Sequence, residues 1–405
     1  MPAATPSLPT FPMTRECPFD PPSAYRSLRR TRPVIRVQLP SGMQAWLVTG
    51  HDLIRTLLND TRLSADRTNP DFPTPVILPA EMKHELDRVS RALLGLDPPE
   101  HSARRRALAG EFTFRKAQAL RPAAGQIVNE AVTSMLAEPG RRADLVDKVS
   151  LPVPSLVICE LLGVPYADRA QFQGYARTLL DRSSTLEERG AAAVGTRDYF
   201  TELIAAKAAA PADDLLSRLL AANDASGVFD ADSLIGIAML LQLAGHETTA
   251  NLISLSVVGL LENPDQLQSL RDDPSLLPGA VDEMLRYFTI LDALYRVAVD
   301  GLEIGGVAIQ PGDGVILCLG AANRDETVFP DPDQLQVTRP ARQHMTFAYG
   351  MHQCLGQNLA RMELELVLGA LLARVPTLAL AQPAAELPYK VHSDAYGIFE
   401  VPVTW

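Results

Sequence analysis

The stretch "FAYGMHQCLG", residues 347–356, places one cysteine in a short loop with a phenylalanine, a histidine and two glycines. An apolar run, "LARMELELVLGALLARVP", follows and predicts a helix over about 357–375. Gly350 and Gly356 permit sharp turns and the close approach of a flat ligand to the backbone. Cys354 is therefore either a buried, inert thiol that packs like a small apolar side chain, or a sulfur held toward a ligand.

The position of Cys354 just before a helix bears on this choice. The thiolate is the form that binds metals, and an ordinary thiol with a pKa of about 8.5 needs help to ionise at neutral pH. The unpaired amides and positive dipole end of a helix that begins near Gln357 favour an anion. We therefore expect the helix to help keep Cys354 anionic.

Composition limits the classes of protein to consider. The chain has 405 residues, a net charge of −11 and a pI of about 5.2, which argues against general nucleic-acid binding. Its N-terminus is rich in proline and has no apolar signal-peptide core. The four cysteines are scattered with no CxxC pair, which is typical of a reducing compartment. We expect a cytoplasmic protein; the cysteines are Cys17, Cys159, Cys318 and Cys354.

Residues 232–264, "DSLIGIAMLLQLAGHETTANLISLSVVGLLENP", resemble a membrane span in length and hydropathy. Gly245, His246 and Glu247 fall in their middle, however, where a spanning helix is ordinarily apolar. A long helix through the core of a globular protein is the better interpretation. A polar cluster at its centre then requires a purpose, because burial of unpaired polar groups is costly.

The remaining pattern is mainly helical with small β elements. Residues 33–50 predict two strands joined by a turn at 40–42, residues 51–60 a helix, and residues 68–80 a proline-rich loop. Residues 293–325 predict a small sheet, 326–353 a loop and the last ten residues a strand. We expect one domain over 1–405, with an extended proline-rich lead over 1–20. Breaks within a mostly helical stretch over about 100–265 are predicted at Pro122, Pro139, Pro152, Pro154, Pro165 and Pro211.

The cysteine loop resembles the haem-ligand loop of the cytochrome P450 family, in which phenylalanine, glycine, a basic residue, cysteine and glycine recur at these spacings. Ala348 departs from the glycine often found at that position. The resemblance implies haem b, with Cys354 as the iron ligand whose electron donation favours O–O cleavage. It also implies a mainly α fold with small β-sheets, in which the haem lies between the long central helix and the helix after the cysteine loop.

"LAGHETT", residues 243–249, resembles the oxygen-activating motif of the same family. The resemblance implies that Glu247 and Thr248 are the acid–alcohol pair that delivers protons to bound oxygen. It also implies that Ala244 borders the haem and that Gly245 thins the helix to admit dioxygen. The alternative interpretation is a polar turn or an exposed polar run.

Further residues match the cofactor-binding positions of the family. Each of the basic ones is, on its own, equally compatible with a solvated surface side chain, and His344 is a weaker further candidate for the same role. The resemblance implies that arginine and histidine pair with the two haem carboxylates, while Phe347 shields the sulfur and Gly350 and Gly356 give the haem room. The basic positions are His101, Arg105, Arg296 and His352.

"EMLR", residues 283–286, places Glu283 and Arg286 on one helical face. Alone this pair is indistinguishable from a surface salt bridge. Its position between the long helix and the cysteine loop resembles the buried ExxR pair of the family, which implies structural support for the haem pocket.

The family alignment also predicts the walls of a substrate pocket. Most of these side chains are apolar, which suits a mainly apolar organic substrate. Asp292 is the exception: either it binds a polar or amine group of the substrate, or it turns to solvent or caps the strand. The predicted wall residues are Leu240, Leu243, Leu291, Asp292, Leu294 and Ile398.

Together these features predict a haem-thiolate monooxygenase of the bacterial, actinobacterial secondary-metabolism type. We expect a monomer that hydroxylates, epoxidises or oxidatively couples a small molecule, and that uses no membrane or nucleic acid. With no flavin or iron–sulfur module recognisable in the chain, electrons from NAD(P)H must arrive through a ferredoxin and a ferredoxin reductase. The alternatives are a peroxide-driven haem-thiolate oxygenase and a non-catalytic haem sensor or carrier.

Overall fold

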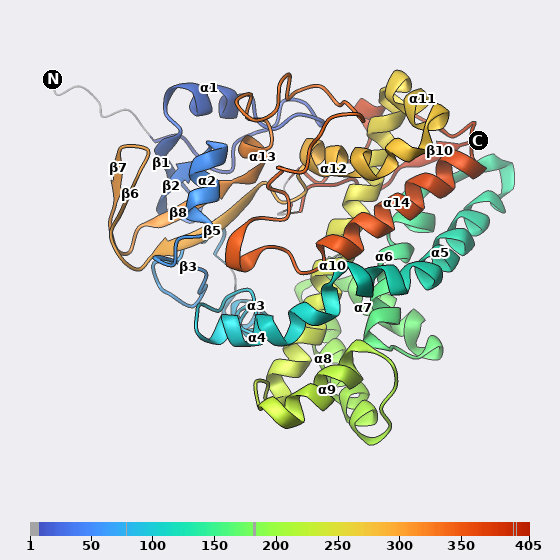
Figure 1. Ribbon diagram of the computed structural model, residues 1–405, viewed down its shortest axis with the longest axis horizontal. Helices are drawn as coiled ribbons and strands as arrows, with labels where there is room; N and C mark the ends of the chain where they lie inside the picture. The colour runs from blue at the N-terminus through green and yellow to red at the C-terminus, as the bar shows by residue number, and fades with distance from the viewer. Residues whose placement is uncertain (1–7, 78, 181–183, 392, 394) are drawn as a thin grey trace.

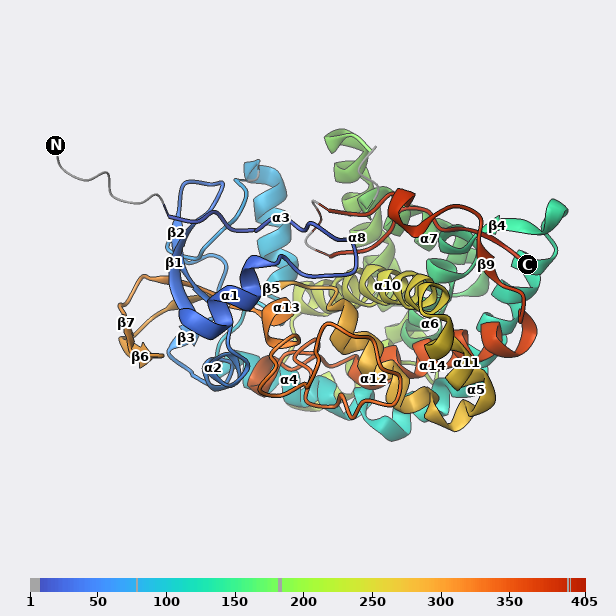
Figure 2. The ribbon, with the colours of Figure 1, turned by 90° about the horizontal axis from the view of Figure 1, so that it is seen from above.

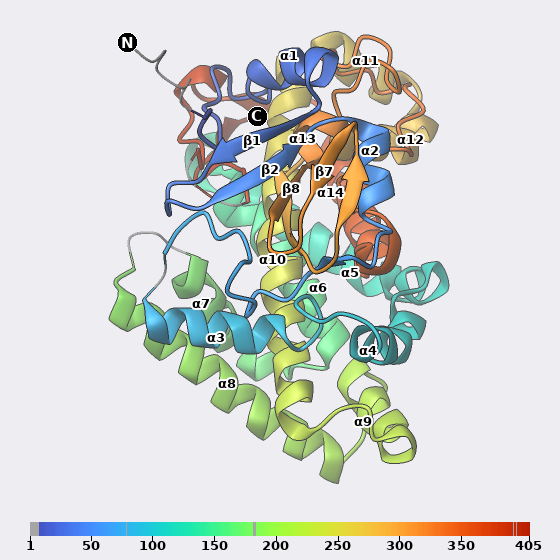
Figure 3. The same ribbon diagram turned by 90° about the vertical axis from the view of Figure 1, so that its left-hand side faces the viewer.

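A computed structural model describes residues 8–77, 79–180, 184–391, 393 and 395–405. Helix α10 (Ala231–Glu262) runs through the middle of the molecule, as Figures 1 and 3 show. It has 32 residues, so at about 1.5 Å per residue it spans about 48 Å. The prediction of a long internal helix is confirmed, and within the described residues no helix is long and apolar enough to cross a membrane.

Other helices surround α10 on several sides. Those that pack directly against it include α3 (Ala80–Ser90), α6 (Pro152–Leu162), α7 (Arg169–Leu180), α8 (Leu186–Ala209), α11 (Pro264–Asp272), α12 (Leu277–Phe288) and α14 (Gln357–Arg374). The remaining helices are α1 (Ala24–Thr31), α2 (His51–Leu57), α4 (Glu100–Ala109), α5 (Phe114–Leu136), α9 (Leu215–Ser226) and α13 (Leu319–Ala322). This arrangement explains why α10 is buried on nearly every face.

Pro122 lies inside α5, so the helix break predicted at this residue is wrong. Proline removes one main-chain donor and crowds the preceding turn. Helix α5 packs against both α14 and α6, and this tertiary packing stabilises a helix that local sequence disfavours.

A five-stranded sheet lies to one side of α10 (Figure 3). Its order is β1-β2-β8-β5-β3, in which only β2 and β8 are parallel. Its strands are β1 (Val34–Gln38), β2 (Gln44–Val48), β3 (Leu63–Ser64), β5 (Ala293–Ala298) and β8 (Gly314–Cys318). The hairpin predicted over 33–50 is confirmed, as is the sheet that begins at residue 293.

Two smaller sheets complete the fold. One joins β4 (Arg142–Asp144), β10 (Pro402–Thr404) and β9 (Ala379–Leu380); the other is the hairpin of β6 (Leu302–Ile304) and β7 (Val307–Ile309). The predicted C-terminal strand is therefore present but only three residues long. Figure 2 views α10 along its axis, with the sheet on one side and α5, α6 and α14 on the other. The mainly α fold with small sheets is confirmed.

Candidate active site

The cysteine loop is folded as a tight turn before α14. The amide of Cys354 donates to the carbonyl of Phe347 at 2.8 Å, which closes the turn. Ala348 and Gly350 both have positive φ, +56° and +71°. A β-carbon at Gly350 would lie 2.7 Å from the carbonyl oxygen of Leu58, so this glycine is required for packing against the end of α2. The expected role in making room for haem fits Gly356 better, since a β-carbon there would lie 4.0 Å from the sulfur.

The sulfur of Cys354 is exposed, but the protein around it is dense. Burial is the largest influence on the thiol and raises its pKa. The amides of Gly356 and Gln357, at the start of α14, and the charge of Arg105 oppose this rise. The expected direction of the helix effect is confirmed, although burial outweighs it in the polypeptide by itself. A metal ion bound at the sulfur would supply further positive charge, since a coordinating thiol loses its proton.

Four basic side chains gather beside this loop. The rings of His101, from α4, and His352 lie 4.1 Å apart between centroids. Arg105, one turn further along α4, donates to the carbonyl of Gln353 at 2.5 Å. Arg296 reaches the same place from β5, where it pairs with Val315 of β8, and its charge acts on both histidines.

The electrostatics of this cluster indicate that it is built for anions. Burial, with the charges of Arg296, His101 and Arg105, lowers the pKa of His352 to about 2, and burial lowers that of Arg296 to about 10. None of the four basic groups forms an ion pair within the described part of the chain. Both ring nitrogens of His101, which is 1% exposed, also lack a hydrogen-bond partner.

These observations fit a haem. Two carboxylates placed against the four basic groups would offset their repulsion and satisfy the buried histidine. Among the described residues no group of three or more His, Cys, Asp or Glu side chains lies close enough together to hold a metal. His344 lies outside the cluster: it is buried 3.6 Å from Asp282, which also binds Arg361 at 2.7 Å.

Helix α10 remains continuous through the predicted oxygen-activating motif, but its surface there is less covered than elsewhere. Ala244 is exposed although most of the helix is buried. One turn later the Thr248 hydroxyl donates to the Ala244 carbonyl at 2.7 Å, so the two residues share a face. A β-carbon at Gly245 would lie 2.7 Å from the end of the Ile158 side chain, so this glycine also allows α6 to pack closely. Its expected role in admitting dioxygen stays a prediction.

Glu247 has a partner that the sequence did not reveal. Its carboxylate accepts from the ammonium of Lys390 at 3.1 Å, and Lys390 also donates to Asn251 at 2.9 Å. Lys390 is 143 residues away in the chain and stands in no recognisable motif. Only the fold brings it to α10.

Glu283 and Arg286 form a completely buried pair. The guanidinium donates to both carboxylate oxygens at 2.7 and 2.8 Å and to the carbonyls of Asn323 and Pro332 at 2.9 and 2.8 Å. Glu283 also accepts from the amide of Gln336 at 2.9 Å. The pair therefore fastens α12 to the long loop that precedes the cysteine turn.

The predicted substrate-wall residues come from three elements. Leu240 (8% exposed) and Leu243 lie on α10, and Leu291 precedes β5, where it bridges to Ala395. Ile398 is fully buried near the C-terminus. Leu294 is half-buried in β5.

Asp292 faces the N-terminal lead. It accepts from the Tyr25 hydroxyl at 2.5 Å and lies 3.6 Å from the guanidinium of Arg15. Its second oxygen, Oδ1, is buried without a hydrogen bond. The carboxylate therefore neither caps the strand nor turns to open solvent; it ties the wall to the lead.

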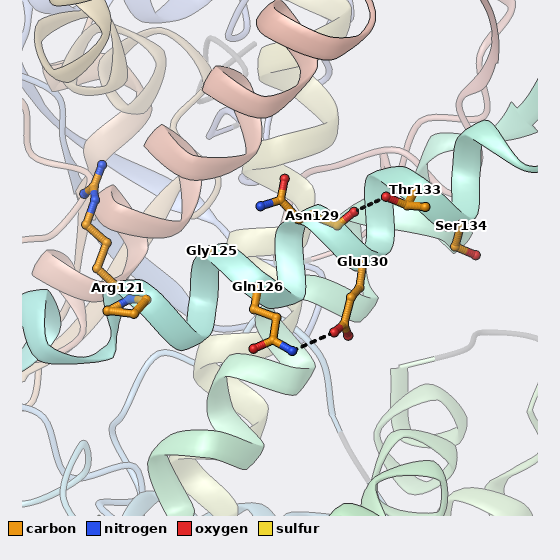
Figure 4. A pocket seen from close by; sticks show the side chains of 8 residues that line it. Arg121, Gly125, Gln126, Asn129, Glu130, Thr133 and Ser134 are labelled. Atoms are coloured by element: carbon orange, nitrogen blue, oxygen red, sulfur yellow. Dashed lines mark hydrogen bonds between the residues drawn. The ribbon is translucent and has the colours of Figure 1, made fainter.

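Figure 4 shows a hollow on α5 that plays no part in this site. Its polar side chains bond to one another, with Gln126 donating to Glu130 at 2.9 Å and Thr133 to the carbonyl of Asn129 at 2.7 Å. Arg374, at the far end of α14 from Cys354, also binds Asn129. The hollow thus lies at the opposite end of α14 from the sulfur.

A cysteine in a tight turn before α14, a buried basic cluster suited to two carboxylates and a long central helix with an exposed Ala244 are the features of a haem-thiolate protein. The model of the cytochrome P450 family matches residues 181–377. A pentalenic acid synthase of Streptomyces avermitilis is 46% identical over 396 residues, 98% of this chain and 97% of its own. A vitamin D3 dihydroxylase of Streptomyces griseolus is 47% identical over 407 residues, 99% and 98% of the two chains.

The solved structures give the same result. The crystal structure of cytochrome P450 MoxA from Nonomuraea recticatena, of the CYP105 type, superposes with a TM-score of 0.92 at 47% identity over 98% of each chain. The chain described here belongs to the cytochrome P450 family and is a monooxygenase of the actinobacterial type.

Proposed function

We propose that this enzyme hydroxylates a mainly apolar small organic molecule, a natural-product intermediate. A haem held by Cys354 and the basic cluster would supply the redox chemistry that activates dioxygen. The overall reaction balances as R–H + O₂ + 2 e⁻ + 2 H⁺ → R–OH + H₂O. One observation supports the proposal: Cys354 and its basic neighbours lie beside α14, and the expected acid–alcohol pair lies in the middle of α10, which packs against α14.

Glu247 and Thr248 are suited to deliver the two protons. The Glu247 side chain is 16% exposed, so it borders both solvent and the interior. The Thr248 hydroxyl, which donates to the Ala244 carbonyl, retains lone pairs to accept a proton donor. A carboxylate that takes protons from solvent and a hydroxyl that passes them on form a relay.

The proposed wall residues and the names of relatives support a mainly apolar substrate. Leu240, Leu243, Leu291, Leu294 and Ile398 offer apolar surface. One relative is named as a dihydroxylase of vitamin D3 and another as a pentalenic acid synthase. Hydroxylation is therefore favoured over oxidative coupling.

A ferredoxin, reduced by its reductase with NAD(P)H, would supply the electrons. Beside the cysteine turn, Asn358 binds the carbonyl of Phe112 at 3.0 Å, which places the start of α5 there. Arg106 and Arg115 are exposed in this region, and the Phe114 side chain between them is 68% exposed. A basic surface with an apolar centre suits an acidic partner although the whole chain carries −11.

The relay can be tested by electron-coupled turnover. With ferredoxin, reductase and a substrate that displaces iron-bound water, Thr248→Ala and Glu247→Gln should each lower the product formed per NAD(P)H by on the order of 10²-fold. The electrons should appear as hydrogen peroxide, because reduced oxygen that receives no directed proton is released. Thr249→Ala, a change at the neighbouring buried threonine, is the control and should form as much product per NAD(P)H as the parent.

Two outcomes contradict the proposal. Full turnover with hydrogen peroxide alone, insensitive to both relay changes, identifies a peroxide-driven oxygenase. Haem binding without product from any compound that displaces the iron-bound water identifies a sensor or carrier.

A further inference from the structure

Lys390 is a buried lysine whose ammonium is held by two hydrogen bonds. The residue is 8% exposed, and lysine is almost never buried unless it is paired. Two of its three donors are used, one by Glu247 at 3.1 Å and one by Asn251 at 2.9 Å. Both acceptors lie on α10, four residues apart and so on one face.

Lys390 belongs to a C-terminal turn, described over residues 389–391, 393 and 395–398, that contacts α10 directly. The amide of Lys390 donates to the carbonyl of Gly397 at 2.8 Å, and Tyr389 bridges to Ile398. The Asn251 amide group donates to the carbonyl of Ala395 at 3.4 Å. A β-carbon at Gly397 would lie 2.2 Å from Asn251, so the turn has no space to sit closer.

This turn joins two parts of the proposed machinery. Ile398, at its end, is a predicted substrate wall, while Lys390, at its start, holds the relay acid. Among the described residues, Lys390 is the side chain hydrogen-bonded to Glu247. Glu247 and Thr248 are consecutive and do not face each other on the helix, so the direction of the carboxylate depends on what holds it.

We propose that Lys390 is a positioning residue for Glu247. It fixes the relay carboxylate against the C-terminal turn, so that the position of the turn, and hence the fit of the substrate at its wall, sets how well Glu247 serves Thr248. This rests on the proposed function, because it assigns Lys390 a part in the same proton relay. Lys390 itself touches neither substrate nor oxygen in this role.

The test is a double-mutant cycle on the holoenzyme with ferredoxin and reductase. Lys390→Met should lower product per NAD(P)H about 10-fold or more, since a ~1 Å displacement of a catalytic group can cost on the order of 10²-fold. Lys390→Arg should restore much of the loss. In a Glu247→Gln background, Lys390→Met should have no further effect. Lys207→Met, which breaks a comparably buried pair with Asp214 on other helices, is the control and should couple normally.

A second measurement does not depend on activity. The falls in melting temperature caused by Lys390→Met and Glu247→Gln should be non-additive, because the two side chains stabilise the fold through one contact. Two results would overturn the inference without affecting the proposed relay. One is additive falls in melting temperature; the other is an equal loss of product per NAD(P)H when Lys390→Met is made in the parent and in the Glu247→Gln variant. Normal coupling in Glu247→Gln alone overturns the relay, and with it this inference.

Discussion

Glu363 is a buried acid that neither the sequence motifs nor the proposed chemistry uses. It lies on α14, 2% exposed, and one of its carboxylate oxygens has no hydrogen-bond partner. Burial alone raises its pKa from 4.5 to about 8. The folded protein therefore holds a proton on this residue at neutral pH that the unfolded chain releases.

This proton makes stability fall as pH rises. Protonated Glu363 contributes to the free energy of unfolding. This contribution is fully present below pH 4.5, the pKa in the unfolded chain, and is lost as the pH rises to about 8, the pKa in the folded protein. Glu363→Gln should remove this dependence. The free energy of unfolding of the variant minus that of the parent should therefore increase with pH, by up to about 1.4 kcal/mol per pH unit in this window. Urea unfolding of the holoenzyme across the window measures it.

Glu365→Gln is the matched control for this change. Glu365 lies two residues away on the same helix but is ion-paired with Arg121 at 2.9 Å. Its replacement should give no gain that grows with pH. A Glu363→Gln variant that follows the same course as the Glu365→Gln variant would contradict the assignment.

At the residue scale, sequence predicts best what is local. Cys354 and Gly356 lie within one ten-residue motif, and its resemblance to the haem-ligand loop of the cytochrome P450 family indicated a haem site. The close packing at Gly245 and Gly350 was not predicted, because the groups that lie against them, on α6 and after α2, are distant in sequence. The contact of Lys390 with Glu247 was not predicted for the same reason, since the two residues are 143 positions apart and no motif links them.

At the element scale, the buried pair on α12 connects the haem loop to the helical core. Glu283→Gln should leave the fully buried Arg286 without its counter-charge and lower the free energy of unfolding by about 3–5 kcal/mol. Glu365→Gln breaks a partly exposed pair and should cost about 1 kcal/mol or less. Urea unfolding followed by circular dichroism compares them, and equal losses would show that the pair on α12 is not a structural tie.

Elements were predictable where the pattern was long. The 32-residue α10 was predictable because its sequence is long, mostly apolar and free of internal proline. The two- and three-residue strands β3 and β4 do not, because a strand so short has no alternation to recognise. The helix break predicted at Pro122 was wrong for a different reason, because tertiary packing keeps α5 helical across this residue.

At the scale of the whole molecule, the fold brings the ends of the chain to one centre. Arg15 of the lead lies over the ring of Tyr396 at 4.2 Å, and the Tyr396 hydroxyl donates to the carbonyl of Pro18 at 2.7 Å. The N-terminal lead thereby holds the C-terminal turn that carries Lys390. No sequence pattern predicts such contacts, which depend on the complete fold.

The central claim is that Cys354 is the thiolate ligand of a haem iron. The most direct test is the difference spectrum of the reduced holoenzyme with carbon monoxide. The account predicts the absorption band typical of cysteinate-ligated haem in the parent protein and its loss in Cys354→Ala, while Cys318→Ala, a change at a buried cysteine in β8, retains it. A chain that binds no haem, or a Cys354→Ala variant that keeps the band, would contradict it.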